Sequence, residues 1–167
     1  MAARHHEREV FVDAPAAEVF AFVDDHSRFS AHMSQSSWMM GGGHMSVELD
    51  DLKGQAVGSH IRLSGNVFGL RLYLDEVVTL RERPTRKVWE TVGTPQLLVI
   101  GKYEMGIQIV PEGAGSRLRV FIDYDLPRHW ATKWLGVVFG GFYAKWCVNQ
   151  MLTGTAQHFQ SFIRAAA

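Results

Sequence analysis

The chain has 167 residues, the length of about one domain. Its 17 basic and 17 acidic residues cancel, and 47% of its residues are hydrophobic, which argues against extended disorder and against a general nucleic-acid-binding charge. We therefore expect one globular domain over residues 1–167, with enough chain to bury a sizeable core.

Cysteine use and terminal composition predict a cytoplasmic location. Cys147 is the only cysteine, so the chain cannot form an intramolecular disulfide or supply a zinc cluster from cysteines. Residues 1–10 are polar and lack the apolar segment of a signal peptide. Residues 130–148 approach the length of a membrane span, but Lys133 and Lys145 interrupt them, so we expect no integral membrane segment.

The first part of the chain predicts a strand followed by two short helices. Residues 9–13 are β-branched and aromatic, and they stop just before Pro15, a residue well tolerated in the first turn of a helix. Apolar residues then recur at helical spacing, at Val19, Phe20, Phe22 and Val23. Turn and capping residues follow, and they predict a second short helix over residues 29–33.

After a glycine run at residues 41–43, apolar and polar residues alternate, which is typical of half-buried strands. Turn signals such as Arg83-Pro84 separate the runs. Consecutive strands with short turns predict an antiparallel meander, and the lack of intervening helical patterns argues against a parallel nucleotide-binding sheet. The predicted strands cover residues 45–49, 59–67, 70–82, 87–92, 97–110 and 117–124.

The last quarter of the chain predicts one long helix. Polar residues recur at intervals of three or four from Lys145 to Arg164, which places them on one solvated face, while the opposite face is apolar and must cover the sheet. We expect the aromatic-rich residues 130–142 to form a linker ahead of this helix. Gly154 costs about 1 kcal/mol in a helix relative to alanine, and close backbone approach, room for a ligand and ordinary tolerance are all open explanations.

Several motifs run through these elements. Residues 10–25 read VFVDAPAAEVFAFVDD, a strand that passes into a helix through Ala14-Pro15. Further along stand Val57-Gly58-Ser59, then Asp75-Glu76-Val77-Val78 ahead of Arg83-Pro84, and finally Met151-Leu152 and Phe159 in the closing helix. Together with the order of the elements, these motifs resemble the START-like superfamily, in particular its bacterial polyketide cyclase/dehydrase and lipid-transport branch.

The resemblance spans nearly the whole chain and implies an α+β helix-grip fold. Its expected form is an antiparallel seven-stranded sheet wrapped around a long C-terminal helix, with two short helices after the first strand. The resemblance also implies a hydrophobic cavity between the sheet and the helix. An apolar cavity with a few polar groups is the usual form of a small-molecule site.

Two glutamates interrupt apolar rows of the predicted strands and are candidates to face this cavity. Glu76 follows Leu70, Leu72 and Leu74 in alternation, and Glu90 lies between Val88 and Val92. An inward carboxylate is costly without a partner, so the pair could serve proton transfer. The alternatives are a β-bulge that returns either glutamate to solvent, or pairing with Arg62 or Arg119. The resemblance favours an architectural role for Glu76.

The same alternation places further candidate ligand-binding residues toward the interior. Tyr103 and Met105 share one face of their strand, and a buried tyrosine needs a hydrogen-bond partner, which could be a ligand or the backbone. Methionine suits an adaptable apolar pocket, although it also fills gaps in ordinary cores. The remaining candidates are Trp89 and Tyr124 on strands and Trp146 and Met151 on the closing helix.

The sequence gives little support for a metal site or for a reactive cysteine. The eight histidines lack metal-ligand spacing, so we expect no metal site and no cofactor. Cys147 lies in apolar surroundings, which predicts an inert buried thiol. The apolar residues Trp38, Met39 and Met40 precede the glycine run, and we hypothesise that they form a lid over the cavity.

Three functions are consistent with the sequence. The first is a cytoplasmic carrier or sensor that binds a small hydrophobic molecule, such as a lipid or a polyketide, between sheet and helix. The second is an aromatase/cyclase-like enzyme that acts on a poly-carbonyl substrate in the same cavity. In the third, residues 130–142 form a surface that contacts a partner or a membrane. No nucleic-acid partner is expected, and a homodimer is compatible with the sequence.

Overall fold

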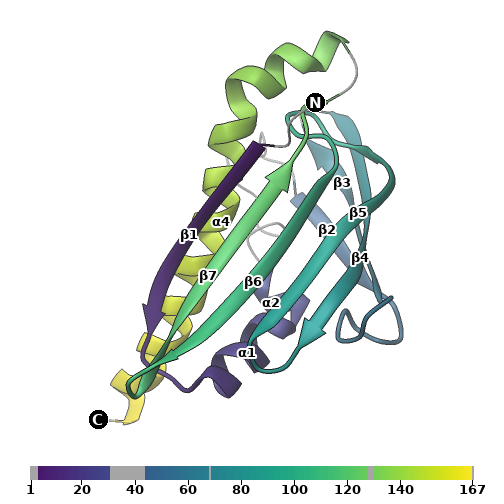
Figure 1. Cartoon of the computed structure of the whole chain (residues 1–167). Coiled ribbons are helices and arrows are strands. Elements are labelled where there is room, and N and C mark those ends of the chain that lie inside the picture. Colours follow the sequence, from purple (N-terminus) through teal and green to yellow (C-terminus); the bar gives the residue numbers. More distant parts are fainter. Residues whose placement is uncertain (1–3, 31–43, 68, 128–129, 167) are drawn as a thin grey trace.

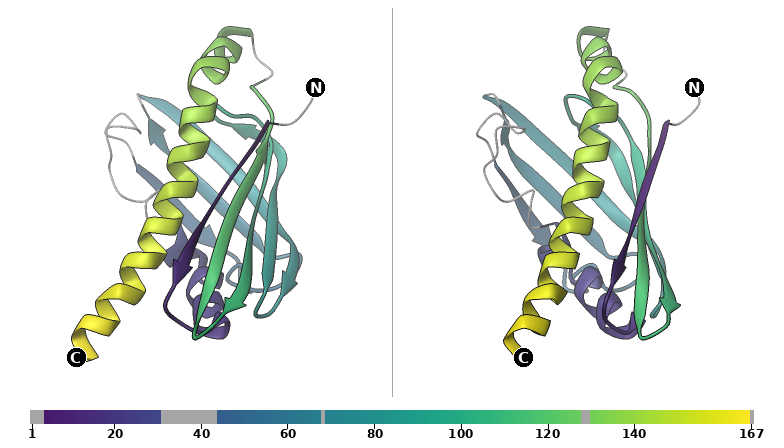
Figure 2. Two further views of the ribbon diagram at one scale, coloured as in Figure 1. Left: turned by 60° about the vertical axis from the view of Figure 1, so that its left-hand side comes forward. Right: turned by 90° about the vertical axis from the view of Figure 1, so that its left-hand side faces the viewer.

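The structure is a computed structural model that describes residues 4–30, 44–67, 69–127 and 130–166. Seven strands form one antiparallel sheet in the order β1-β7-β6-β5-β4-β3-β2. The sheet curves around the long helix α4, and the short helices α1 and α2 lie at one end of it (Figures 1 and 2). The elements are β1 (Arg4–Val12), α1 (Ala16–Asp24), α2 (His26–Phe29), β2 (His44–Leu49), β3 (His60–Val67), β4 (Leu70–Glu82), β5 (Arg86–Gln96), β6 (Tyr103–Glu112), β7 (Gly115–Tyr124) and α4 (Trp130–Ala166).

This architecture confirms the predicted helix-grip fold, including the number of strands and the two short helices after β1. Helix α2 begins earlier than predicted, because Asp25 caps it by accepting hydrogen bonds from the backbone N–H groups of Ser27 and Arg28. The predicted strand 97–110 was wrong at its start, since β6 begins at Tyr103.

The prediction of a linker over residues 130–142 was also wrong, because these residues are the N-terminal part of α4. Gly136 and Gly140 let the helix pack closely: a Cβ added to either would lie 2.9 Å or 2.8 Å, respectively, from the backbone oxygen of Val99. None of the helices in the described ranges, including α4 with its 37 residues, has an apolar stretch that could cross a bilayer.

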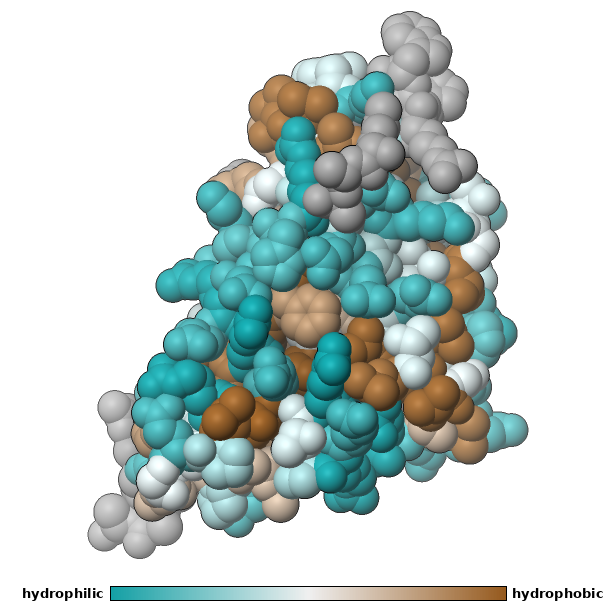
Figure 3. All heavy atoms as spheres, in the orientation of Figure 1, coloured by the Kyte–Doolittle hydropathy of each residue, from teal (hydrophilic) through white to brown (hydrophobic). Residues whose placement is uncertain are grey.

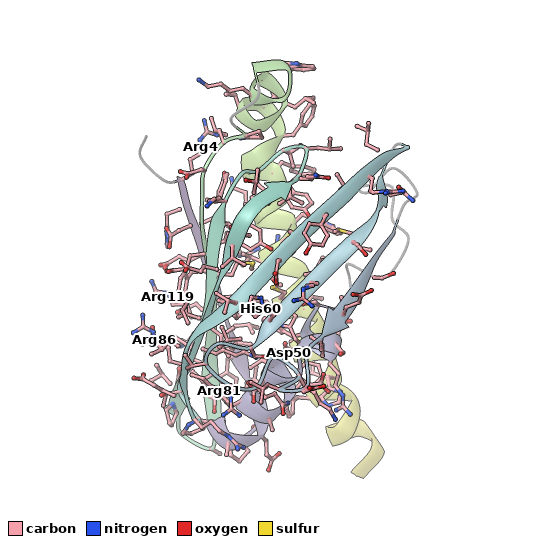
Figure 4. All side chains as sticks on the ribbon, turned by 90° about the vertical axis from the view of Figure 1, so that its right-hand side faces the viewer. Arg4, Asp50, His60, Arg81, Arg86 and Arg119 are labelled. Carbon is pink, nitrogen blue, oxygen red and sulfur yellow. The ribbon has the colours of Figure 1, made fainter. Side chains whose placement is uncertain are left out.

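A buried ion cluster joins α1 to the sheet at the end where α1 and α2 lie. Arg81 of β4, labelled in Figure 4, donates to the Asp24 carboxylate at 2.7 Å. Lys87 of β5, which is 0% exposed, places its Nζ 3.0 Å from an Asp24 carboxylate oxygen and 3.0 Å from the Asp24 backbone oxygen. The cluster therefore neutralises the buried carboxylate and also caps the C-terminus of α1.

Gly154 lies at an open position of α4, so its replacement by alanine is expected to raise the free energy of unfolding by about 1 kcal/mol. A Cβ added there meets nothing within 4 Å, and alanine restricts the unfolded chain more than glycine does. The structure thus supplies no close approach that would require this glycine. Thermal denaturation should show an increase of about 2–4 °C in the midpoint.

The matched control is Gly140→Ala in the same helix, which should lower the midpoint because its new Cβ would press on the fixed Val99 carbonyl. A decrease for Gly154→Ala of the same size as that for Gly140→Ala would show that Gly154 does have a packing role.

Candidate functional site

The described residues line a cavity of about 40 Å³ between the inner face of the sheet and α4. This central cavity has room for about three water molecules. Its wall is mainly apolar, with Leu63, Leu74, Met105, Ile122 and Met151 among its members. The polar side chains that reach it are His26, Ser30, Glu76, Tyr103, Tyr143 and Cys147.

The polar centre of the cavity is built across three neighbouring strands. Glu76 of β4 pairs in register with Thr91 of β5, and the Thr91 hydroxyl oxygen accepts a hydrogen bond from the backbone N–H of Tyr103 in β6 at 3.1 Å. The small Thr91 leaves room for Tyr103 to reach over it. The Tyr103 hydroxyl donates a hydrogen bond to Oε1 of Glu76.

His26 completes this centre from α2. Its Nε2 lies 3.6 Å from Oε2 of Glu76, and both side chains are almost wholly buried. The His26 ring packs edge-on against Trp89, with ring centroids 5.3 Å apart. A carboxylate, a phenol and an imidazole therefore meet in otherwise apolar surroundings.

Two atoms of this centre have no hydrogen-bond partner among the described residues: Oε2 of Glu76 and Nδ1 of His26. Buried polar atoms are nearly always hydrogen-bonded to protein or ordered water, and an unpaired one costs about 1–3 kcal/mol. Since both side chains line the cavity, its contents are the natural partner for these atoms.

The buried hydroxyl and thiol groups of the cavity stay protonated at neutral pH. Burial and the neighbouring Glu76 carboxylate raise the pKa of Tyr103 well above 10, so it acts as a hydrogen-bond donor. Burial raises the pKa of the Cys147 thiol to about 12, against the opposing hydrogen bond from Tyr143. Cys147 is thus no thiolate nucleophile at neutral pH.

A comparison with curated protein sequences found no significant match. The model of the family described as "polyketide cyclase / dehydrase and lipid transport" matches residues 3–160. The chain belongs to this family.

Solved structures show the family fold. The ZhuI aromatase/cyclase from a Streptomyces species superposes with a TM-score of 0.72 at 16% identity, covering 99% of this chain and 98% of the other. A Thermus thermophilus protein gives 0.67 at 15% identity, covering 95% and 98%. A truncated norcoclaurine synthase from Thalictrum flavum gives 0.65 at 14% identity, covering 94% of each chain.

In this member of the polyketide cyclase and lipid-transport family, the structure places five of the candidate residues at the cavity wall: Glu76, Trp89, Tyr103, Met105 and Met151. Tyr124 and Trp146 are not among the lining residues described. Tyr124 is buried against α4 at Gly140 and Gly141, and the half-buried Trp146 packs beside Tyr143, with ring centroids 5.9 Å apart. Trp38, Met39 and Met40 lie outside the described residues.

Glu90 does not face the cavity, and that expectation was wrong. Glu90 is exposed on the outer face of β5, whereas Trp89 and Thr91 are buried. The inner row of β5 includes the charged Lys87, which is buried because Asp24 neutralises it. Val88 and Val92, two positions before and after Glu90, lie on the same outer face of β5. The more apolar face of this strand is therefore the outer one, which is why alternation gave the wrong direction for Glu90.

Sequence reasoning missed His26, Ser30 and Tyr143 as cavity residues. His26 stands in a polar run that reads as a turn, and nothing local shows that its ring is buried. The expected arginine partners of the glutamates are also placed elsewhere: Arg62 lies 3.6 Å from Asp75, and Arg119 bonds to Glu7. Among the described residues, no three His, Cys, Asp or Glu side chains are grouped so that they could hold a metal ion.

Proposed function

We propose that this protein binds a small, mostly apolar molecule in the central cavity and acts as its carrier or sensor. The observation that carries the proposal is the combination of an apolar wall with one buried polar centre that keeps two unpartnered atoms, Oε2 of Glu76 and Nδ1 of His26. Such a cavity is the usual form of a small-molecule site. The family description, which includes lipid transport, supports the same class of ligand.

The centre favours a ligand with a hydroxyl or phenol group at one end. Tyr103 already donates to Oε1 of Glu76, so the remaining oxygen can accept a hydrogen bond from the ligand. His26 Nδ1 offers a second, separate polar contact at the cavity wall. Apolar burial supplies most of the binding energy, at about 25 cal/mol per Å² removed from water, less the cost of association.

A ligand of lipid or polyketide size requires the cavity to widen, because about 40 Å³ holds only a few atoms. Met105 and Met151 suit such a change, since methionine has three rotatable bonds and adapts to irregular space. The ligand-bound state should therefore differ from this one mainly in the methionine side chains and in the distance between α4 and the sheet.

The proposal is tested by titrating the fluorescent probe ANS into two variants that differ only inside the cavity. Cys147→Leu adds volume at the wall and is expected to weaken ANS binding about tenfold or more, whereas Cys147→Ala removes volume and should preserve it. ANS bound elsewhere on the surface contributes equally to both variants. Equal binding by the two variants would show that the cavity is a packed core.

A second candidate function is an aromatase/cyclase-like enzyme acting on a poly-carbonyl chain. The observation that favours it is the buried Glu76–His26 pair, whose atoms lie 3.6 Å apart beside a neutral Tyr103 donor. Such groups can take up and return a proton at a carbon next to a carbonyl. Turnover of a poly-β-ketone by the wild type would establish the enzyme if both Glu76→Gln and His26→Gln abolish it. Recovery of the poly-β-ketone unchanged would favour the carrier function instead.

A further inference from the structure

Five large apolar side chains are exposed on the N-terminal half of α4. These are Trp134, Val137, Val138, Phe139 and Phe142, each 47% to 61% exposed, and we call them the α4 patch. Figure 3 shows hydrophobic atoms gathered at the upper left, where Figure 1 draws this part of the helix. Scattered exposed apolar residues are ordinary, but a cluster of this kind marks an interaction surface.

The helix geometry shows that this patch is not used in the fold. Gly136 and Gly140 form the face of α4 that packs against Val99. Trp134, Val138 and Phe142 follow one another at intervals of four, so they share a stripe on the other side of the helix. A helix that is apolar around its circumference is normally buried, and here the outer side is covered by none of the described residues.

The charges that α4 itself carries beside the patch are positive. Helix α4 has no Asp or Glu in its 37 residues. Lys133 and Lys145, both exposed, lie at either end of the patch. Arg8 of β1 donates to the Asn149 side chain of α4 at 2.6 Å, which brings another cation to this side. Arg4, at the start of β1, lies toward the same end of the molecule (Figure 4).

We propose that the α4 patch docks onto an anionic lipid surface. Aromatic and aliphatic side chains flanked by lysines are the features that hold a helix in the plane of a membrane interface, and the lysines meet anionic headgroups. This site is separate from the central cavity and goes beyond the ligand binding proposed above, since it fixes where the protein would work.

Charge also decides against a second copy of the chain as the occupant. A parallel pair of patches sets each Lys133 beside its counterpart, and an antiparallel pair centred on Phe139 sets Lys133 beside Lys145 of the other copy. Helix α4 offers no acidic residue to offset either arrangement. An anionic surface turns the same lysines into favourable contacts.

The test is co-sedimentation of the full chain with vesicles of phosphatidylcholine alone or mixed equally with phosphatidylglycerol. The wild type should bind the mixed vesicles and bind pure phosphatidylcholine weakly. Trp134→Asp is expected to lower the affinity about tenfold or more, and Lys133→Gln and Lys145→Gln about fivefold each. High salt should weaken binding of the wild type.

The matched control is Val57→Asp, which places the same charge at a residue that is 60% exposed between β2 and β3. It should bind as the wild type does. Thermal denaturation of Trp134→Asp, whose side chain is 59% exposed, should match the wild type and so exclude misfolding. Equal vesicle binding by wild type and Trp134→Asp would overturn the proposal, as would a dimer in light scattering that Trp134→Asp dissociates.

Discussion

Replacing Asp24 with alanine is expected to lower the free energy of unfolding by about 3–5 kcal/mol, the range for breaking a buried ion pair from one side. The change leaves the Lys87 ammonium, which is 0% exposed, without its counter-ion. It also frees Arg81, which anchors β4 to the end of α1. Urea denaturation at neutral pH measures the effect.

The control is Arg117→Ala, which removes an equally short ion pair on the surface. Arg117 lies 2.6 Å from Glu112, and both side chains are well exposed, so its loss should destabilise the protein far less than the loss of Asp24, because water screens surface ion pairs. A similar small loss for Asp24→Ala would show that the cluster does not hold α1 to the sheet.

The difference in the free energy of unfolding between the wild type and Asp24→Ala should depend on pH. Burial by itself raises the pKa of the Asp24 carboxyl, but the hydrogen bond from Arg81 and the charge of Lys87 together hold it below its ordinary value. The stabilisation is therefore present above the unfolded pKa of about 3.9 and is lost as the pH falls through the folded value. The gap between wild type and Asp24→Ala should narrow in acid.

Tyr103→Phe is expected to cost about 1–3 kcal/mol, because it leaves the buried Glu76 carboxylate without its hydrogen-bond donor. The double variant Tyr103→Phe with Glu76→Leu removes both partners and should recover much of that loss, since replacing both groups of a buried pair by apolar ones is nearly neutral. Urea denaturation of the single and double variants forms the cycle.

The same variants separate stability from ligand binding. The double variant keeps an apolar wall but lacks the Glu76 carboxylate and the Tyr103 hydroxyl, so it should still bind ANS while its preference for ligands with a terminal hydroxyl is reduced. Additive losses in the cycle would show that Tyr103 and Glu76 act independently and do not form one polar centre.

Alternation of apolar residues predicted most of the sheet, because most strands bury one face in the core that the sheet shares with the helices. The prediction matched β4 at both ends and found every strand. It was wrong where local pattern and tertiary packing disagree. Residues 130–142 lack a clear polar face, so their helix could not be recognised, and the pairing of Gly136 and Gly140 with Val99 depends on a distant segment.

Periodicity along the strands predicted only part of the candidate site. Inward positions on strands follow from periodicity, which brought Glu76, Tyr103 and Met105 into the candidate set. Periodicity does not predict the contact between Glu76 and Tyr103, because β5 separates β4 from β6 and the contact crosses over Thr91. His26 comes from another element altogether, and only the packing of α2 against Trp89 brings it to the cavity.

Ligand binding in the central cavity is measured directly by native mass spectrometry of the wild type and Cys147→Leu after incubation with the same mixture of fatty acids, sterols and aromatic polyketides. We expect the wild type to retain one equivalent of an apolar molecule and the Cys147→Leu variant to retain none. Both proteins bare, or both carrying the same molecule in the same amount, would contradict binding in the central cavity.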